Sequence, residues 1–212
     1  MIAPRRALIV VDVQQEYFEG PLEIQFPPRA KSFVNIIDAI ATANARDIPV
    51  LVVQHQIPQG SPVFVEGTAG WSLLPGIERH IDPASKRVHK QHGSVFAGTD
   101  VSQWLHANNV DTVTIVGYMT NNCDLATAVE AEGLGFAVEV LSDATGAVSL
   151  TNEAGTISAE ALHTILMVLL QSNLATVSTT ARWMDALRTG AKLPKSNLVQ
   201  SAIDGHSAAT GT

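Results

Sequence analysis

Three side chains in this sequence could form the catalytic centre of an enzyme that attacks a carbonyl: a cysteine, an aspartate and a lysine. Cys123 is the only cysteine of the chain and lies where an apolar strand pattern changes to a helical one. A free thiol is mostly protonated at neutral pH, but a helix N-terminus and a nearby ammonium group, here that of Lys90, both favour the thiolate. Asp12 could accept the thiol proton and return it to a leaving amine. This set predicts acyl transfer, with backbone N–H groups beside Cys123 as the oxyanion site.

The elements that must position these residues follow an alternating pattern. Short β-branched runs alternate with segments of helical period, which predicts an α/β fold with a doubly wound, six-stranded, mainly parallel sheet flanked by helices. Because the carboxyl ends of parallel strands share one edge, Asp12, Lys90 and Cys123 can converge there from distant positions. The expected strands are 8–11, 50–53, 87–89, 112–116, 136–141 and 175–177. The expected helices include one with the apolar stripe Leu162, Ile165, Leu166 and Leu169.

The domain organisation expected from length and composition is simple. A chain of 212 residues with 46% hydrophobic composition can bury one full core, so we predict a single domain over residues 1–190. A polar tail over 191–212 is expected to be mobile unless it docks on a partner subunit. The segment 56–83 is rich in glycine and proline and predicts a long ordered loop that covers something.

Charge and composition exclude several classes of protein. The formal net charge is −7, with 20 acidic and 13 basic residues and no long run of either sign, so nucleic acid is not an expected partner. No apolar run approaches the roughly 20 residues of a membrane span, so no membrane association is expected. A single cysteine cannot form an internal disulfide, and a reducing cytoplasm is the default location.

Three motifs, in the correct order, resemble those of the isochorismatase-like cysteine hydrolases, the family related to nicotinamidases. The run LIVVDVQQEY at 8–17 is similar to the opening motif of the family, with Tyr17 where an aromatic residue is usual. Val88-His89-Lys90, followed by Ser94 and Phe96, resembles the lysine motif. GYMTNNC at 117–123 resembles the nucleophile motif, and the likeness extends over about residues 7–188.

The resemblance implies a function and a mechanism. It implies that Asp12, Lys90 and Cys123 are catalytic, and that an amide, ureido or lactam C–N bond of a small molecule is hydrolysed through a thioester on Cys123. It also implies a cis peptide bond between Tyr118 and Met119, which would aim the Met119 and Cys123 amides at the oxyanion. A homo-oligomer, either a dimer or a tetramer, is expected as well.

The substrate pocket is less specified by the sequence than the catalytic set. Tyr17, Trp71 and Tyr118 could supply an aromatic substrate surface, although such residues are as often part of a core or a subunit interface. Nicotinamidases of the family place an aspartate and two histidines as metal ligands after the second strand, where only His55 resembles a ligand here. Because zinc requires three or four ligands, we expect no metal and no other cofactor. His55 could instead bind a substrate carbonyl or simply end a strand.

Two other classes of function stay open at this point. Cys123 could be a low-pKa thiol in a redox or ligand-sensing protein, with sulfenic acid as its oxidised form because no resolving cysteine is present. A noncatalytic scaffold with the same fold would be expected to lose one of the three polar residues, and this chain has retained all three.

Overall fold

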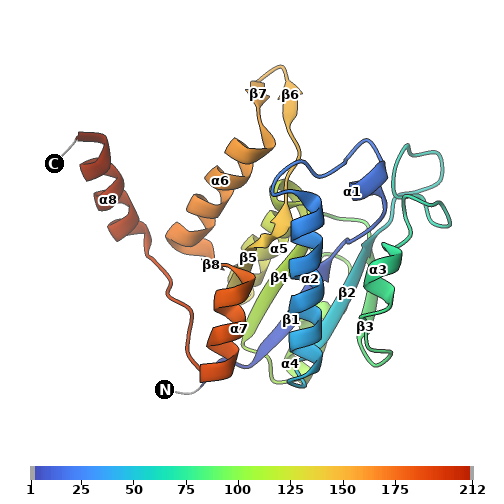
Figure 1. Ribbon diagram of the computed structural model, residues 1–212, viewed down its shortest axis with the longest axis horizontal. Coiled ribbons are helices and arrows are strands. Elements are labelled where there is room, and N and C mark those ends of the chain that lie inside the picture. The colour runs from blue at the N-terminus through green and yellow to red at the C-terminus, as the bar shows by residue number, and fades with distance from the viewer. Residues whose placement is uncertain (1–2, 211–212) are drawn as a thin grey trace.

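The computed structural model describes residues 3–210 and has a six-stranded sheet at its centre (Figure 1). The strand order is β3-β2-β1-β4-β5-β8, and every neighbouring pair is parallel. This is the predicted doubly wound α/β fold. The strands are β1 (Arg6–Val11), β2 (Val50–His55), β3 (Lys86–Lys90), β4 (Thr112–Tyr118), β5 (Ala137–Gly146) and β8 (Thr176–Ser178).

Both faces of the sheet are covered by helices, which explains why the central strands are apolar throughout. Successive residues of β1 point to opposite faces, so Leu8 and Val10 belong to one core and Ile9 and Val11 to the other. The first core includes residues of α2 (Arg29–Asn44) and α7 (Thr180–Thr189). The second includes residues of α4 (Val101–Ala107) and α5 (Leu125–Gly133). No helix within residues 3–210 is long and apolar enough to cross a membrane.

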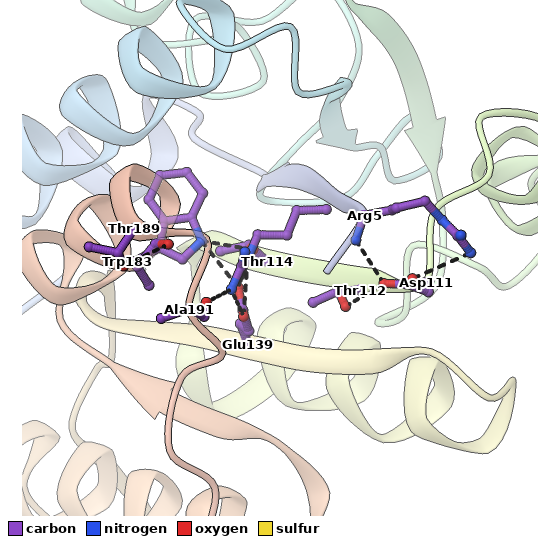
Figure 2. Close-up of polar contacts among 10 residues, drawn as sticks. Arg5, Asp111, Thr112, Thr114, Glu139, Trp183, Thr189 and Ala191 are labelled. Atoms are coloured by element: carbon purple, nitrogen blue, oxygen red, sulfur yellow. Dashed lines mark hydrogen bonds and ion pairs between the residues drawn. The ribbon is translucent and has the colours of Figure 1, made fainter. Parts of the chain in front are cut away.

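A buried ion pair ties β1 to β5 within the sheet. The guanidinium group of Arg6 donates to both carboxylate oxygens of Glu139, at 2.8 to 3.1 Å. Figure 2 shows Thr114 and Trp183 pointing toward the same carboxylate, and each donates a hydrogen bond to Glu139 Oε2, at 2.8 and 3.1 Å. The charge of Glu139 is therefore matched by Arg6 and by two neutral donors, which is what a buried carboxylate requires.

Several elements differ from the sequence expectation. The sequence pattern does not predict the antiparallel hairpin of β6 (Leu150–Asn152) and β7 (Gly155–Ile157), because the two strands are short and most of their residues are exposed. The segment 56–83 is mostly irregular, as expected, but contains α3 (Pro75–Glu78). Short α1 (Glu16–Glu19) follows β1.

The largest differences lie in the C-terminal third. In α6 (Ala159–Leu169) the stripe indicated by the sequence is only partly buried: Leu166 is covered, while Ile165 and Leu169 are exposed. The residues 191–212, expected to be a polar tail, contain α8 (Leu198–Thr210), which has no buried residue. A π-helical segment, Leu170–Leu174, ends α6, and another, Thr120–Asp124, precedes α5.

Candidate active site

The sheet brings Asp12, Lys90 and Cys123 to one edge, at the carboxyl ends of three strands. Asp12 directly follows β1, Lys90 is the last residue of β3, and Cys123 lies in the π-helical segment after β4. Asp12 has a left-handed backbone conformation with φ of 49°, which aspartate tolerates better than most residues. Gly117 allows β4 to approach the end of β1 closely, because a Cβ atom at this position would lie 2.0 Å from the Val11 carbonyl oxygen. The residues that follow β1 and β4, Asp12 and Cys123, can therefore lie in one site.

Lys90 is the centre of this site. Its Nζ atom lies 2.6 Å from Asp12 Oδ2 and 3.2 Å from Cys123 Sγ. The same ammonium group donates to His55 Nδ1 at 3.0 Å and to the His92 carbonyl oxygen at 3.1 Å. Four acceptors thus compete for three ammonium protons, so the hydrogen bond to the thiol can be exchanged for another without removing the ion pair.

The site is closed to solvent. The Asp12 and Lys90 side chains are fully buried, and Cys123 is 1% exposed. Within residues 3–210 no N–H or O–H group other than the ammonium is placed to bond the Asp12 carboxylate. In such surroundings a charge is stable only beside its counter-ion. Asp12 and Lys90 therefore form a mutually dependent pair.

Burial sets the protonation state of the thiol. Removal from water raises the pKa of Cys123, the nearby Asp12 carboxylate raises it further, and Lys90 only partly opposes them. Burial by itself would lower the pKa of Lys90, but Asp12 and Cys123 outweigh it, so that pKa is raised. The resting site accordingly holds a neutral thiol beside an ion pair. The sequence indicated that Lys90 favours the thiolate, but in the structure the desolvation of Cys123 outweighs the attraction of Lys90.

His55 is neutral and has a defined tautomer. Burial and the charge of Lys90 lower its pKa. Because an ammonium group can only donate, Nδ1 must accept the bond from Lys90, which leaves the proton on Nε2. His55 can therefore donate a hydrogen bond from Nε2, as the binding of a substrate carbonyl would require.

The same geometry bears on metal binding. One ligand atom each from Asp12, His55 and Cys123 lie within 4.8 Å of one another, close enough to hold an ion. The Lys90 ammonium, however, contacts all three residues. A metal ion at this point would have to displace an ammonium that already supplies the positive charge, so these residues do not fit a metal site.

The backbone around the nucleophile is tightly organised. The Tyr118–Met119 peptide bond is cis, at the position where the family resemblance places one. The Met119 carbonyl oxygen accepts the amide protons of Asn122 and Asp124, at 3.0 and 3.2 Å. These bonds hold the segment Thr120–Asp124 in its π-helical turn and place Cys123 just before α5, which begins at Leu125. The role of the Met119 and Cys123 amides at an oxyanion stays a prediction.

An aromatic cluster lies beside the site. The rings of Tyr17 and Tyr118 have centroids 5.6 Å apart, and both side chains are buried. Phe64, from the long loop 56–83, packs at 5.3 Å against both Tyr17 and His55. The loop therefore covers the side of the site that His55 faces.

Trp71 lies outside this cluster, and Tyr118, although part of it, is also bonded to α2. The Trp71 ring packs on His89, at 5.3 Å, and no ring contact joins it to the catalytic set within the described chain. The Tyr118 hydroxyl is 2.8 Å from Ser32 Oγ, on α2. Tyr118 is thus held by the core, whereas the Trp71 ring lies against the residue of β3 that precedes Lys90.

Two further residues belong to the site, although sequence reasoning does not single them out. The buried Gln14 side chain bonds the backbone of His55 in both directions, at 2.8 and 3.0 Å, and donates to the Trp71 carbonyl oxygen at 2.7 Å. It thereby fixes the end of β2 and the long loop together. The one signal for Gln14 in the sequence is that it is an amide residue placed two positions after Asp12.

Asp124 is the second residue of this kind. Its carboxyl group is completely buried beside the nucleophile, and neither oxygen has a hydrogen-bond partner among residues 3–210. Burial raises its pKa well above the ordinary value, and the Asp12 carboxylate adds to this, so the group is neutral. Its spacing from Thr120, Thr127 and Ala131 places it on the buried face of the segment, which the sequence alone could have indicated.

Comparison with known proteins gives a consistent result. The family model described as "Isochorismatase domain" matches residues 6–182. A crystal structure of a candidate isochorismatase from Burkholderia xenovorans LB400 superposes with a TM-score of 0.95 and 42% identity, covering 98% of this chain and 99% of that one. The chain is 30% identical to the nicotinamidase/pyrazinamidase of Mycobacterium tuberculosis, over 68% of this chain and 88% of the relative. It is 28% identical to the maleamate amidohydrolase of Pseudomonas putida, over 66% and 71% respectively.

Proposed function

This chain belongs to the isochorismatase family, and we propose that it is a cysteine hydrolase that cleaves an amide, ureido or lactam C–N bond of a small molecule. The family includes hydrolases of amide bonds, among them the nicotinamidase and the maleamate amidohydrolase named above. The observation that carries the proposal is the contact of one buried ammonium, that of Lys90, with both a carboxylate and a thiol.

The chemistry begins with a proton transfer. Cys123 gives its thiol proton to Asp12 as the sulfur attacks the substrate carbonyl, and Lys90 stabilises the sulfur as it becomes negative. The C–S bond forms while the carbonyl oxygen takes up the negative charge. Donors at that oxygen would be the Met119 and Cys123 amides, and a single such donor contributes about 3 to 4 kcal/mol in a known case.

The second half returns the proton and regenerates the thiol. Asp12 protonates the departing nitrogen as the C–N bond breaks, which leaves a thioester on Cys123. A water molecule then attacks the thioester carbonyl, gives one proton to Asp12, and releases the acid as the proton returns to sulfur. A neutral resting thiol suits this cycle, because the proton that Asp12 removes is the one that the leaving nitrogen needs.

The geometry disfavours the sensing alternative. Redox-sensing cysteines are exposed and have a low pKa. Cys123 is 1% exposed and burial raises its pKa. A sensing function would therefore need Cys123 to be a thiolate at rest, whereas burial and the Asp12 carboxylate raise its pKa and favour the neutral thiol.

The test is ammonia release and intact mass across a panel of small amides, ureido acids and lactams. Cys123→Ala and Asp12→Asn are compared with Val129→Ala, a control on the exposed side of α5. Turnover that disappears in the first two variants and persists in the control, with an acyl adduct trapped from a slow substrate, supports the proposal. Because Cys123 is the only cysteine, any thiol adduct must be on it. No turnover and no adduct across the panel, with ready oxidation by peroxide, would favour the sensing function.

A further inference from the structure

The C-terminal helix α8 presents an apolar face that nothing within residues 3–210 covers. At 100° per residue, Leu198, Val199, Ala202, Ile203 and Ala209 fall on one side of the helix. The three large side chains on that side, Leu198, Val199 and Ile203, are 54 to 69% exposed. The only residues of α8 that are partly covered are two serines, Ser201 and Ser207. The helix therefore points its apolar face away from the body of its own chain.

The position of α8 explains this exposure. Figure 1 shows the helix at the end of an extended segment, 191–197, beyond the sheet, where α8 approaches the π-helical segment Leu170–Leu174. The segment is held by a hydrogen bond from Gln171 to the Pro194 carbonyl oxygen, at 3.2 Å. An isolated helix of this length is marginal in water, and most of the stability of such helices comes from packing of an apolar face. The helix thus requires a surface that its own chain does not provide.

A second uncovered apolar face lies on α6. Ile165, Val168 and Leu169 have the i, i+3, i+4 spacing of one helix stripe and are 48 to 66% exposed. Ile165 and Leu169 belong to the stripe indicated by the sequence, and Val168 extends the exposed face beside them. One chain therefore carries an apolar arm and an apolar body surface, and the two do not cover each other.

Comparison with the Burkholderia xenovorans structure shows that the arm has a defined position. Residues 191–210 are 20 of the 212, yet the two structures superpose with a TM-score of 0.95 over 98% of this chain. A score this high over 98% of the chain requires at least part of the arm to superpose together with the body. The matched family domain ends at residue 182, so the arm lies outside it. A helix that buries none of its residues on its own chain keeps one position only if something else holds it.

We propose that α8 is an exchange arm: in a two-fold dimer, the apolar face of each α8 packs on the Ile165, Val168 and Leu169 surface of a second copy of this chain. A two-fold axis makes this contact self-complementary, so one arrangement covers all four apolar faces. A foreign partner would have to cover two separate surfaces. Neither stripe includes an Asp, Glu, Lys or Arg, as expected of the centre of an interface between identical chains, and His206 is the one titratable residue within the α8 face.

The area is sufficient for a stable dimer. Six half-exposed aliphatic side chains per copy present on the order of 100 Å² of apolar surface each. Two copies then remove on the order of 1,200 Å² from water, which is the lower end of the range for specific, stable interfaces. The polar and backbone atoms of two arms add to this area.

The test uses sedimentation velocity on the full chain and three charged double variants. The arm variant is Val199→Lys/Ile203→Lys, and the surface variant is Ile165→Glu/Val168→Glu; all four positions are at least half exposed, so the fold should tolerate them. Gln200→Lys/Ala208→Lys places the same two charges on the other side of α8 and serves as the control.

The expected wild-type mass is twice the 22.5 kDa of one chain. The arm variant and the surface variant should each fall to half the wild-type mass, while the control keeps it. A mixture of the arm and surface variants should recover the full mass, because one contact is then wild type and the other pairs lysines with glutamates.

Three results would overturn the proposal. They are a wild-type protein that sediments as single chains, an arm variant that keeps the wild-type mass, and a mixture that stays dissociated. Loss of hydrolytic activity is not a readout of this experiment, so its outcome is independent of the proposed function.

Discussion

Replacing Lys90 with methionine tests the catalytic centre most directly, since this change removes the ammonium and keeps most of the side-chain volume. In the wild type, Lys90 Nζ lies 2.6 Å from Asp12 Oδ2, and both side chains have no exposure to solvent. Loss of one partner leaves a buried carboxylate without a counter-ion, a change that typically destabilises a protein by about 3 to 5 kcal/mol. We expect a loss of that size at pH 8, measured by urea unfolding.

The size of the loss should depend on pH in a defined direction. A buried carboxyl without a cation binds its proton more tightly in the folded chain than in the unfolded chain, where half-protonation occurs at about pH 3.9. The folded variant then holds more protons than its unfolded form, so its stability falls as the pH rises. The deficit relative to wild type should therefore be largest near pH 8 and shrink toward pH 4.

The matched control is the double variant Lys90→Met/Asp12→Asn, which removes both charges. It should recover most of the stability lost in Lys90→Met, because no charge is left buried. Both variants should lose activity, by about 100-fold or more, because the proton-transfer pair is broken. A Lys90→Met protein as stable as wild type at pH 8, or a double variant no more stable than the single one, would refute the reasoning.

Three other predictions concern buried titratable groups. The stability of Asp124→Asn should equal that of wild type near pH 4 and exceed it toward pH 8. The reason is that the raised pKa of Asp124 makes the wild type lose stability as the pH rises. Urea midpoints that differ equally at both pH values would contradict this. Burial lowers the pKa of His55 and of His163, so their contribution to stability is present above about pH 6.5 and is lost as the pH falls through the lowered values. The free energy of unfolding of His163→Gln should therefore fall less than that of wild type between pH 7.5 and pH 5, as measured by urea unfolding. Glu139→Gln leaves the buried Arg6 charge unpaired and should lower stability by about 3 to 5 kcal/mol with little change in kcat, since the pair lies away from the catalytic edge, and an unchanged urea midpoint would argue against it.

Much of the fold could be predicted from the sequence, because its signals are local. The run Leu8 to Val11 has the continuous apolar character of a strand buried on both faces, and the structure buries all four residues. The six parallel strands and the convergence of Asp12, Lys90 and Cys123 follow from alternating periods and from the geometry of a parallel sheet. The elements that were missed, β6, β7 and α8, have few or no buried residues and therefore give no strong periodic signal.

Only the tertiary structure decided how these residues affect one another. Residue types indicated a nucleophile, a base and a cation, but the protonation state of Cys123 depends on its burial and on its distances to Asp12 and Lys90, which lie 111 and 33 residues away in the chain. The apolar stripe on α6 is a second example. A 3.6-residue period identifies an apolar helix face but does not say which part of that face is buried against the sheet. Hydrophobic periods are encoded within a few residues, whereas desolvation and charge coupling arise between segments that become neighbours only in the folded chain.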